Sequence, residues 1–108
     1  MSPFSQIGSS NVIHGPQWLS QQPADQYAIQ VVAVADRKEM YDIAQRYNRY
    51  LKDELSYYTV NSGKYVLISG GYATEPEADA VIWRLPRHVN FQRPTKTRMS
   101  DIQQRLSL

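Results

Sequence analysis

The chain has 108 residues, of which 42% are hydrophobic and 20% charged, and its formal net charge is +2. This length suits one domain, and this composition is typical of a water-soluble globular protein, which excludes a disordered or membrane-embedded chain. Cysteine is absent, so disulfides, thiol catalysis and zinc sites built on thiolates are excluded as well. The small positive charge falls short of the dense basic surface of most nucleic-acid-binding proteins.

Residues 1–26 are rich in Ser, Gln, Pro and Gly and have no sustained periodicity, which predicts a linker leading into the domain. Trp18 and Leu19 interrupt this polar segment, and an apolar pair in such a position commonly packs back onto its domain. We therefore expect partial order near Trp18 and place the domain itself at residues 27–108. No stretch is apolar enough to span a membrane, so we expect any signal or anchor elsewhere in a longer, exported parent protein.

The first strand and helix are predicted within residues 27–51. Residues 27–35 are apolar and rich in β-branched side chains, which predicts a strand. Asp36 is then a good helix N-cap, and Glu39, three residues later, completes a capping box. Apolar residues follow at helical spacing, namely Met40, Ile43, Ala44, Tyr47 and Leu51. The segment therefore predicts a strand followed by an amphipathic helix.

Two further strands are predicted at residues 57–60 and 64–69. They surround Asn61-Ser62-Gly63, and a short connection of Asn and Gly is typical of a β-hairpin. We therefore expect these two strands to be antiparallel.

A second helix is predicted after Gly70-Gly71. Thr74 and Glu77 form another capping box, and Pro76 suits the first helical turn. Apolar residues again follow at helical spacing, namely Ala78, Val81, Ile82 and Leu85. Pro86 is predicted to end this helix, since proline cannot continue it.

The last elements are a strand at residues 89–93 and a short third helix. Ser100 and Gln103 are predicted to open that helix, and its apolar positions are Met99, Ile102 and Leu106.

An internal duplication links these elements into a fold. The sequence offset that takes Tyr27 to Tyr65 also takes Asp36 to Thr74 and Glu39 to Glu77, so two strand-to-helix units repeat. Each unit is followed by a further strand, which gives the order βαββαβ. The predicted fold is therefore an α+β sandwich of the ferredoxin or RNP type, with a four-stranded antiparallel sheet, helices on one face, the other face open, and a short C-terminal helix.

Alternation along the strands predicts which side chains lie on the open face. The larger apolar side chains are assigned to the core under the helices, namely Tyr27, Ile29, Val31, Tyr65 and Leu67. Gln30 then lies on the open face beside Val32, Val66 and Ile68. A polar residue inside an otherwise apolar strand needs a reason, so Gln30 is the leading candidate for a binding residue.

Three segments, in this order and spacing, resemble SPOR domains. They are Tyr27-Ala-Ile-Gln30 in the first strand, Lys64-Tyr-Val-Leu-Ile-Ser-Gly70 in the third, and Tyr72-Ala-Thr-Glu-Pro-Glu-Ala78 at the second helix. The similarity covers about residues 18–106. Trp18-Leu-Ser-Gln-Gln-Pro23, Gln92-Arg-Pro94 and Ile102-Gln103 are most similar to the branch that contains the cell-division protein DamX.

The resemblance implies a periplasmic, non-catalytic module that binds peptidoglycan glycan strands whose stem peptides amidases have removed. Such binding brings the parent protein to the division septum, where divisome proteins are further expected partners. In the family the open sheet face binds the sugar backbone with the help of a first-strand glutamine, which corresponds to Gln30. The expected glycan-binding residues are Gln30, Val32, Ala33, Tyr58, Lys64, Val66 and Ile68. We expect no metal, cofactor, nucleic acid or membrane contact for this domain.

Two positions depart from the pattern of DamX-like relatives. Lys64 stands where those relatives have an exposed aromatic residue, and Ala33 replaces a small hydroxyl residue. Lys64 can instead pair with the lactyl carboxylates of a stripped glycan, a contact worth about 0 to 1 kcal/mol by analogy with surface ion pairs. Tyr57 or Tyr58 can supply the missing aromatic, and we expect one of them on each face of the sheet.

Three other functions compete with glycan binding. RNA-recognition domains share the βαββαβ order but stack bases on aromatic residues of the central strands, whereas Tyr27 and Tyr65 are assigned to the core face here. A protein-interaction or dimerisation module would use the apolar open face and would not need Gln30 there. An enzyme is disfavoured, because the only histidines are His14 and His88 and no recognisable catalytic motif is present.

Overall fold

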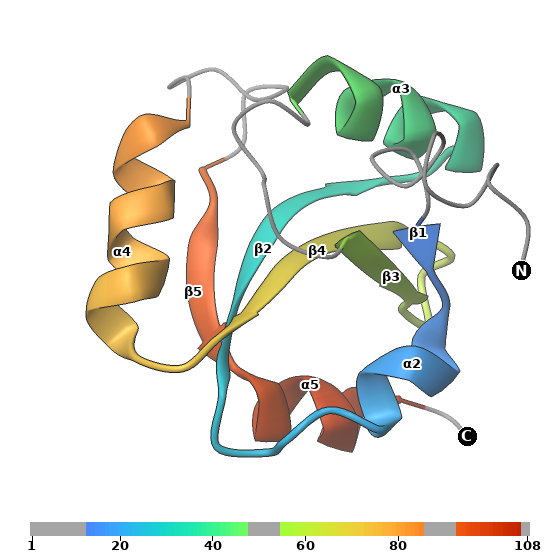
Figure 1. The fold of residues 1–108 in the computed structure, drawn as a ribbon. Helices are drawn as coiled ribbons and strands as arrows, with labels where there is room; N and C mark the ends of the chain where they lie inside the picture. Colours follow the sequence, from blue (N-terminus) through green and yellow to red (C-terminus); the bar gives the residue numbers. More distant parts are fainter. Residues whose placement is uncertain (1–12, 48–54, 86–92, 107–108) are drawn as a thin grey trace, which may run out of the picture.

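A computed structural model describes residues 13–47, 55–85 and 93–106, which form five strands and four helices (Figure 1). In chain order these are β1 (Ile13–His14), α2 (Pro16–Ser20), β2 (Tyr27–Val34), α3 (Arg37–Tyr47), β3 (Leu55–Thr59), β4 (Tyr65–Tyr72), α4 (Glu75–Arg84), β5 (Thr95–Arg98) and α5 (Met99–Arg105). The predicted α+β fold of the RNP type is confirmed.

The strands form one sheet in the order β1-β3-β4-β2-β5. The contacts of β3 with β4, β4 with β2, and β2 with β5 are antiparallel, as predicted. In addition, β1 pairs with β3 in parallel, so the sheet is mixed and has one strand more than expected. This extra strand comes from the segment predicted to be a linker, and two residues are too few to produce a strand pattern in the sequence.

The two main helices, α3 and α4, begin at their predicted N-cap residues, Asp36 and Thr74. The Asp36 side chain accepts a hydrogen bond from the Lys38 backbone N–H, 2.9 Å away. Thr74 Oγ1 accepts from the Glu77 backbone N–H at 3.4 Å and donates to the Glu77 carboxylate at 3.1 Å. The inner faces of α3 and α4 bury Met40, Ile43 and Ala44, and Ala78 and Val81, respectively. Leu51 and Pro86 lie outside the described residues.

The β3–β4 hairpin closes through the predicted Asn-Ser-Gly turn. The Val60 N–H donates to the Lys64 carbonyl at 3.0 Å, and the Gly63 N–H donates to the Val60 carbonyl at 2.8 Å. Gly63 has a φ of 88°, in the left-handed region that glycine adopts without steric cost. The predicted hairpin is confirmed.

The end of the chain differs from the prediction by a few residues. The expected strand at residues 89–93 falls largely outside the described residues, and Arg93 is not part of a strand. The last strand is β5, and it runs directly into α5, where Met99 and Ile102 are fully buried. The short C-terminal helix is therefore confirmed and starts one residue before Ser100.

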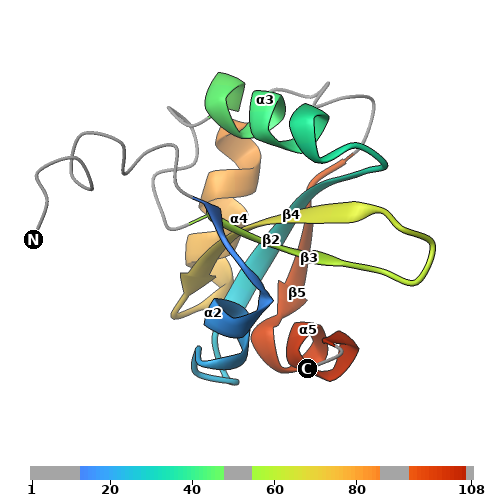
Figure 2. The same ribbon diagram turned by 90° about the vertical axis from the view of Figure 1, so that its right-hand side faces the viewer.

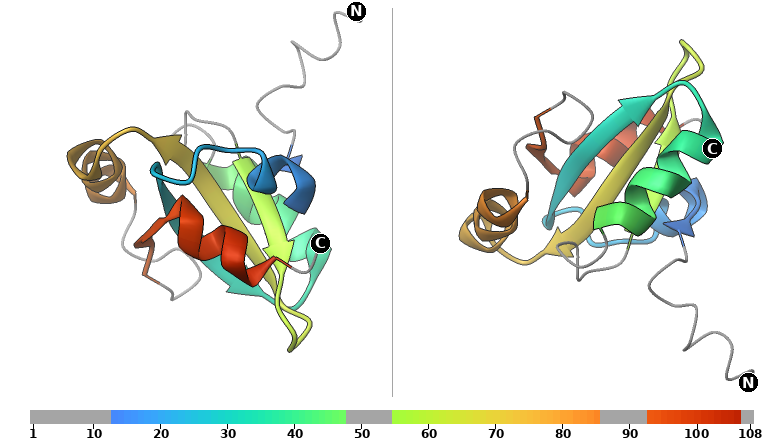
Figure 3. Two further views of the ribbon diagram at one scale, coloured as in Figure 1. Left: turned by 90° about the horizontal axis from the view of Figure 1, so that it is seen from below. Right: turned by 90° about the horizontal axis from the view of Figure 1, so that it is seen from above.

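Helices cover both faces of the sheet, which corrects the prediction of one open face. Figure 2 shows α3 on one side of the sheet and α2 and α5 on the other. The two views of Figure 3 show α2 and α5 in front of the sheet from below, and α3 in front of it from above. Leu19, Met99 and Ile102 pack on the second face against Ala28, Tyr58, Val66 and Ile68. We name α2 and α5 together the cap; it removes from water the apolar patch that alternation had left uncovered.

A β-bulge at Val31 changes which residues of β2 face the cap. The pairing of β2 with β4 shifts between Gln30 and Val32, so Val31 has no partner of its own. Val31 and Val32 both lie in the core under α3 and α4, while Ala33 packs on the cap side. The prediction that Val32 shares a face with Gln30 is therefore wrong, because simple alternation does not anticipate the extra residue.

Candidate functional site

Gln30 lies near the middle of β2, between Ile68 of β4 and Thr95 of β5. Residues directly opposite one another in antiparallel strands share a face, so Gln30 lies on the cap side of the sheet. It is partly exposed, and its side-chain amide has no hydrogen-bond partner among the described residues. The amide therefore has two donors and an acceptor available to a ligand.

Strand β5 continues this polar surface to the edge of the sheet. Thr95 pairs with Gln30 and is exposed, and Thr97 pairs with Ala28 and is partly exposed. Both hydroxyls therefore lie on the same side as Gln30. We name Gln30, Thr95 and Thr97 the polar strip; its side chains offer hydrogen bonds along one edge of the cap-side face.

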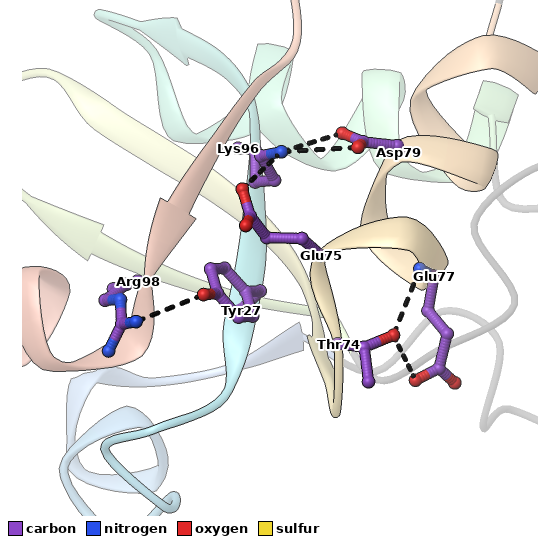
Figure 4. A network of polar contacts seen from close by, with 7 residues as sticks. All are labelled: Tyr27, Thr74, Glu75, Glu77, Asp79, Lys96 and Arg98. Atoms are coloured by element: carbon purple, nitrogen blue, oxygen red, sulfur yellow. Dashed lines mark hydrogen bonds and ion pairs between the residues drawn. The ribbon is translucent and has the colours of Figure 1, made fainter.

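The opposite side of β5 is held by charge pairs, which Figure 4 shows. The Lys96 ammonium lies 2.8 Å from the Glu75 carboxylate and 3.0 Å from that of Asp79, both on α4. These hydrogen bonds, that to Glu75 foremost, raise the pKa of Lys96 above its ordinary value. Arg98 Nη2 donates to the Tyr27 hydroxyl at 3.2 Å, with its guanidinium carbon 5.3 Å from the ring centroid. These contacts fix β5 and with it the polar strip.

Three of the predicted site residues are buried under the cap, namely Tyr58, Val66 and Ile68. Tyr58 Oη accepts a hydrogen bond from Arg105 Nη1 of α5 at 3.2 Å. Ser56 shares this face and is also buried, and its hydroxyl has no hydrogen-bond partner among the described residues. In this arrangement these side chains lie beneath α2 and α5, so they cannot touch a large ligand directly.

The remaining predicted residues on this face reach the surface. Ala33 is partly exposed at the margin of the cap-side cluster, and Lys64 is exposed where the hairpin enters β4. Tyr57 and Tyr58 lie on opposite faces, as predicted. Gln30, Ala33 and Lys64 are therefore the predicted site residues that a ligand can reach on the cap side.

The cap is held together by hydrogen bonds between the two ends of the described chain. Gln103 Nε2 of α5 donates to the carbonyls of Leu19 at 3.0 Å and Gln22 at 2.7 Å. Beside α2, the His14 and Trp18 rings stack with their centroids 4.6 Å apart. The expectation that the Trp18–Leu19 pair packs onto the domain is confirmed, since Leu19 is fully buried and Trp18 packs beside it.

Sequence reasoning missed Thr95 and Thr97, and it assigned Gln103 to the opening of the last helix, whereas its side chain bonds to the carbonyls of Leu19 and Gln22. The signal for this strand in the sequence is weak: β-branched threonines stand at every second position of Thr95-Lys-Thr-Arg98, but all four residues are polar, so no apolar face marks the strand. Within the described ranges, no group of three His, Cys, Asp or Glu side chains is placed to hold a metal ion. No helix among these residues is long and apolar enough to cross a membrane.

Comparison with protein families finds a match to the SPOR domain. The model of the SPOR domain matches residues 23–95, which is more than half of the chain and includes Gln30 and Lys64. Helices α2 and α5 lie outside the matched range. No curated protein matches the chain. SPOR domains are peptidoglycan-binding modules without catalytic activity, found in periplasmic or cell-wall-associated bacterial proteins. From its fold and this match, the chain belongs to the SPOR domain family.

Proposed function

We propose that this domain binds peptidoglycan glycan strands that lack stem peptides, and that it brings its parent protein to the division septum in the periplasm. The observation that carries the proposal is the Gln30 amide, which lies partly exposed on the sheet and has no partner among the described residues. An amide group with no partner among the described residues is suited to the acetamido and hydroxyl groups of a sugar. Divisome proteins are proposed as further partners at the septum.

The proposed contact surface starts from the polar strip and follows the cap-side face toward the hairpin. Gln30 and Thr95 offer hydrogen bonds at one end, and Lys64 offers a positive charge at the other. The lactyl carboxylates of a stripped strand can pair with Lys64 at about 0 to 1 kcal/mol. Ala33 leaves room between them because its side chain is small. Tyr58, Val66 and Ile68 support this surface from beneath the cap.

The buried cap-side cluster also argues against the alternatives. A protein-interaction or dimerisation module would need an exposed apolar sheet face, but α2 and α5 already occupy that face. An RNA-binding module would need aromatic rings exposed on one face of the central strands, but Tyr27 and Tyr65 pack against the core under α3 and α4.

We further propose membership of the DamX-containing branch, on the sequence similarity at residues 18–23, 92–94 and 102–103.

Replacing Gln30 tests this function directly. We expect Gln30→Ala to weaken binding to amidase-treated sacculi by about 1 kcal/mol, the net value of one hydrogen bond, which is a several-fold loss of affinity. Co-sedimentation of the purified domain with intact and with amidase-treated sacculi measures both affinity and preference. RNA in a parallel sample tests the nucleic-acid alternative.

Gln45→Ala is the matched control, because Gln45 is exposed on α3 at the other side of the sheet. It should bind as the unchanged domain does. Equal retention by intact and amidase-treated sacculi would contradict specificity for stripped strands. Unchanged binding of Gln30→Ala would contradict the proposed surface.

A further inference from the structure

Trp83 is the one large hydrophobic side chain that lies exposed among the described residues, with 84% of its surface accessible. It lies on α4, whose buried side chains Ala78 and Val81 point to the sheet instead. An indole left in water forgoes one of the largest hydrophobic contributions that a side chain can make to folding. The fold therefore does not account for tryptophan at this position.

The surroundings of Trp83 leave its ring approachable. At helical spacing, Pro76 and Ala80 lie on the same outward stripe of α4, and both are exposed. Helical side chains lean toward the N-terminus, so the indole lies over the turn that contains Ala80, whose methyl group is too small to cover it. Arg84 is held along its own helix, because its Nε donates to the Ala80 carbonyl at 3.4 Å.

Polar groups border this apolar stripe on both sides. Glu75 and Asp79 lie on the side toward β5, where they hold Lys96, and Glu77 lies on the other side beside Thr74 (Figure 4). The stripe is therefore a narrow exposed surface with hydrogen-bonding groups along its margins.

We propose that Trp83 is a stacking platform for a sugar ring of the glycan strand, an inference that rests on the proposed function. A pyranose ring has apolar C–H faces and polar hydroxyls around its rim, which matches a single indole with polar groups at its margins. A protein partner fits less well, because a stable interface needs about 800 Å² on each side and several apolar anchors. Among the described residues, α4 offers one such anchor.

The position of α4 allows one polymer to reach both surfaces. The Lys96 pairs join α4 to β5, and the opposite side of β5 carries the polar strip. Figure 1 shows α4 beside β5 at this edge of the sheet. A glycan strand that passes around β5 can contact Gln30 and Trp83 together. Two weak contacts made by one glycan polymer raise its overall affinity, because binding at the first site increases the effective concentration of the polymer at the second.

Three substitutions of Trp83 test the stacking platform by co-sedimentation with amidase-treated sacculi. We expect Trp83→Ala to weaken binding by roughly threefold to tenfold. Trp83→Phe should retain part of the affinity because it keeps a flat ring. Trp83→Leu should bind as weakly as Trp83→Ala, since it keeps apolar volume but no ring. Circular dichroism and the melting temperature should be unchanged in all three, because the side chain is exposed.

Fluorescence supplies a direct readout of the same contact. In a Trp18→Phe background, Trp83 is the only tryptophan in the chain. Peptide-free glycan fragments released from amidase-treated sacculi by a muramidase should shift its emission to shorter wavelength and protect it from acrylamide quenching.

The outcomes separate this inference from the proposed function. If the unchanged domain binds stripped sacculi and Trp83→Ala binds equally well, the stacking platform is wrong and the proposed function stands. If Trp83→Leu binds as the unchanged domain does, the contribution of Trp83 comes from a general apolar contact and not from ring stacking, and the stacking platform is wrong. If the unchanged domain does not bind sacculi at all, both proposals fail.

Discussion

At the scale of single residues, Lys96 shows how one side chain fixes the edge of the sheet. Its ammonium contacts the carboxylates of Glu75 and Asp79, which raise the pKa of Lys96 above its ordinary value of 10.5. Because the pKa of Lys96 is higher in the folded than in the unfolded state, its ion pairs stabilise the fold fully below pH 10.5. This stabilisation is lost as the pH rises through the folded-state pKa. We expect Lys96→Met to lower the urea midpoint at pH 7, and the difference from the unchanged domain to shrink above pH 10.5.

Lys38→Met is the control for this measurement, because Lys38 is an exposed lysine on α3 without an ion pair among the described residues. Its urea midpoint should stay close to that of the unchanged domain at both pH values. A Lys96→Met deficit that persists undiminished at high pH would show that packing of the aliphatic chain, rather than charge, holds β5 to α4.

At the scale of elements, Gln103 joins α5 to the segment that contains α2. Its amide donates to two backbone carbonyls, those of Leu19 and Gln22. Hydrogen bonds of this kind contribute about 0.5 to 1.5 kcal/mol each. We therefore expect Gln103→Ala to lower the free energy of unfolding by about 1 to 3 kcal/mol, measured by urea denaturation.

Gln104→Ala is a closely matched control, since Gln104 is the next residue of the same helix and is exposed. Both substitutions change helix propensity equally, and only the first removes the two bonds to the α2 segment. Equal midpoints for the two variants would contradict a stabilising role of Gln103.

The elements also show what the sequence can and cannot predict. Capping residues and apolar spacing predicted α3 and α4, and the Asn-Ser-Gly turn predicted the hairpin, because these signals are local. The bulge at Val31 and the short strand β1 were missed, since both depend on pairing with residues distant in the chain. Met99 and Ile102 were recognised as apolar, but nothing local indicated that they would cover Val66 and Ile68.

At the scale of the whole molecule, the two core clusters lie on opposite faces of the same strands. Loss of the cap would expose Val66 and Ile68, so the two layers should unfold together in one transition. In a Trp83→Phe variant, Trp18 alone reports on the cap by fluorescence, while circular dichroism reports on the whole fold. We expect the two urea curves to coincide. A Trp18 transition at lower urea would show that the cap unfolds by itself.

The sheet ends in short strands on both sides, and this limits how the domain can hold a partner. In the part of the chain that the structure describes, β1 offers two residues and β5 four along the outer edges. Beyond these short strands, residues 31–34 of β2 and 57–59 of β3 also have no neighbouring strand on their outer side among the described residues. An extended segment that added itself to the sheet would find only these short, separate stretches of backbone to pair with, so the binding of a ligand depends more on side chains than on the sheet edges.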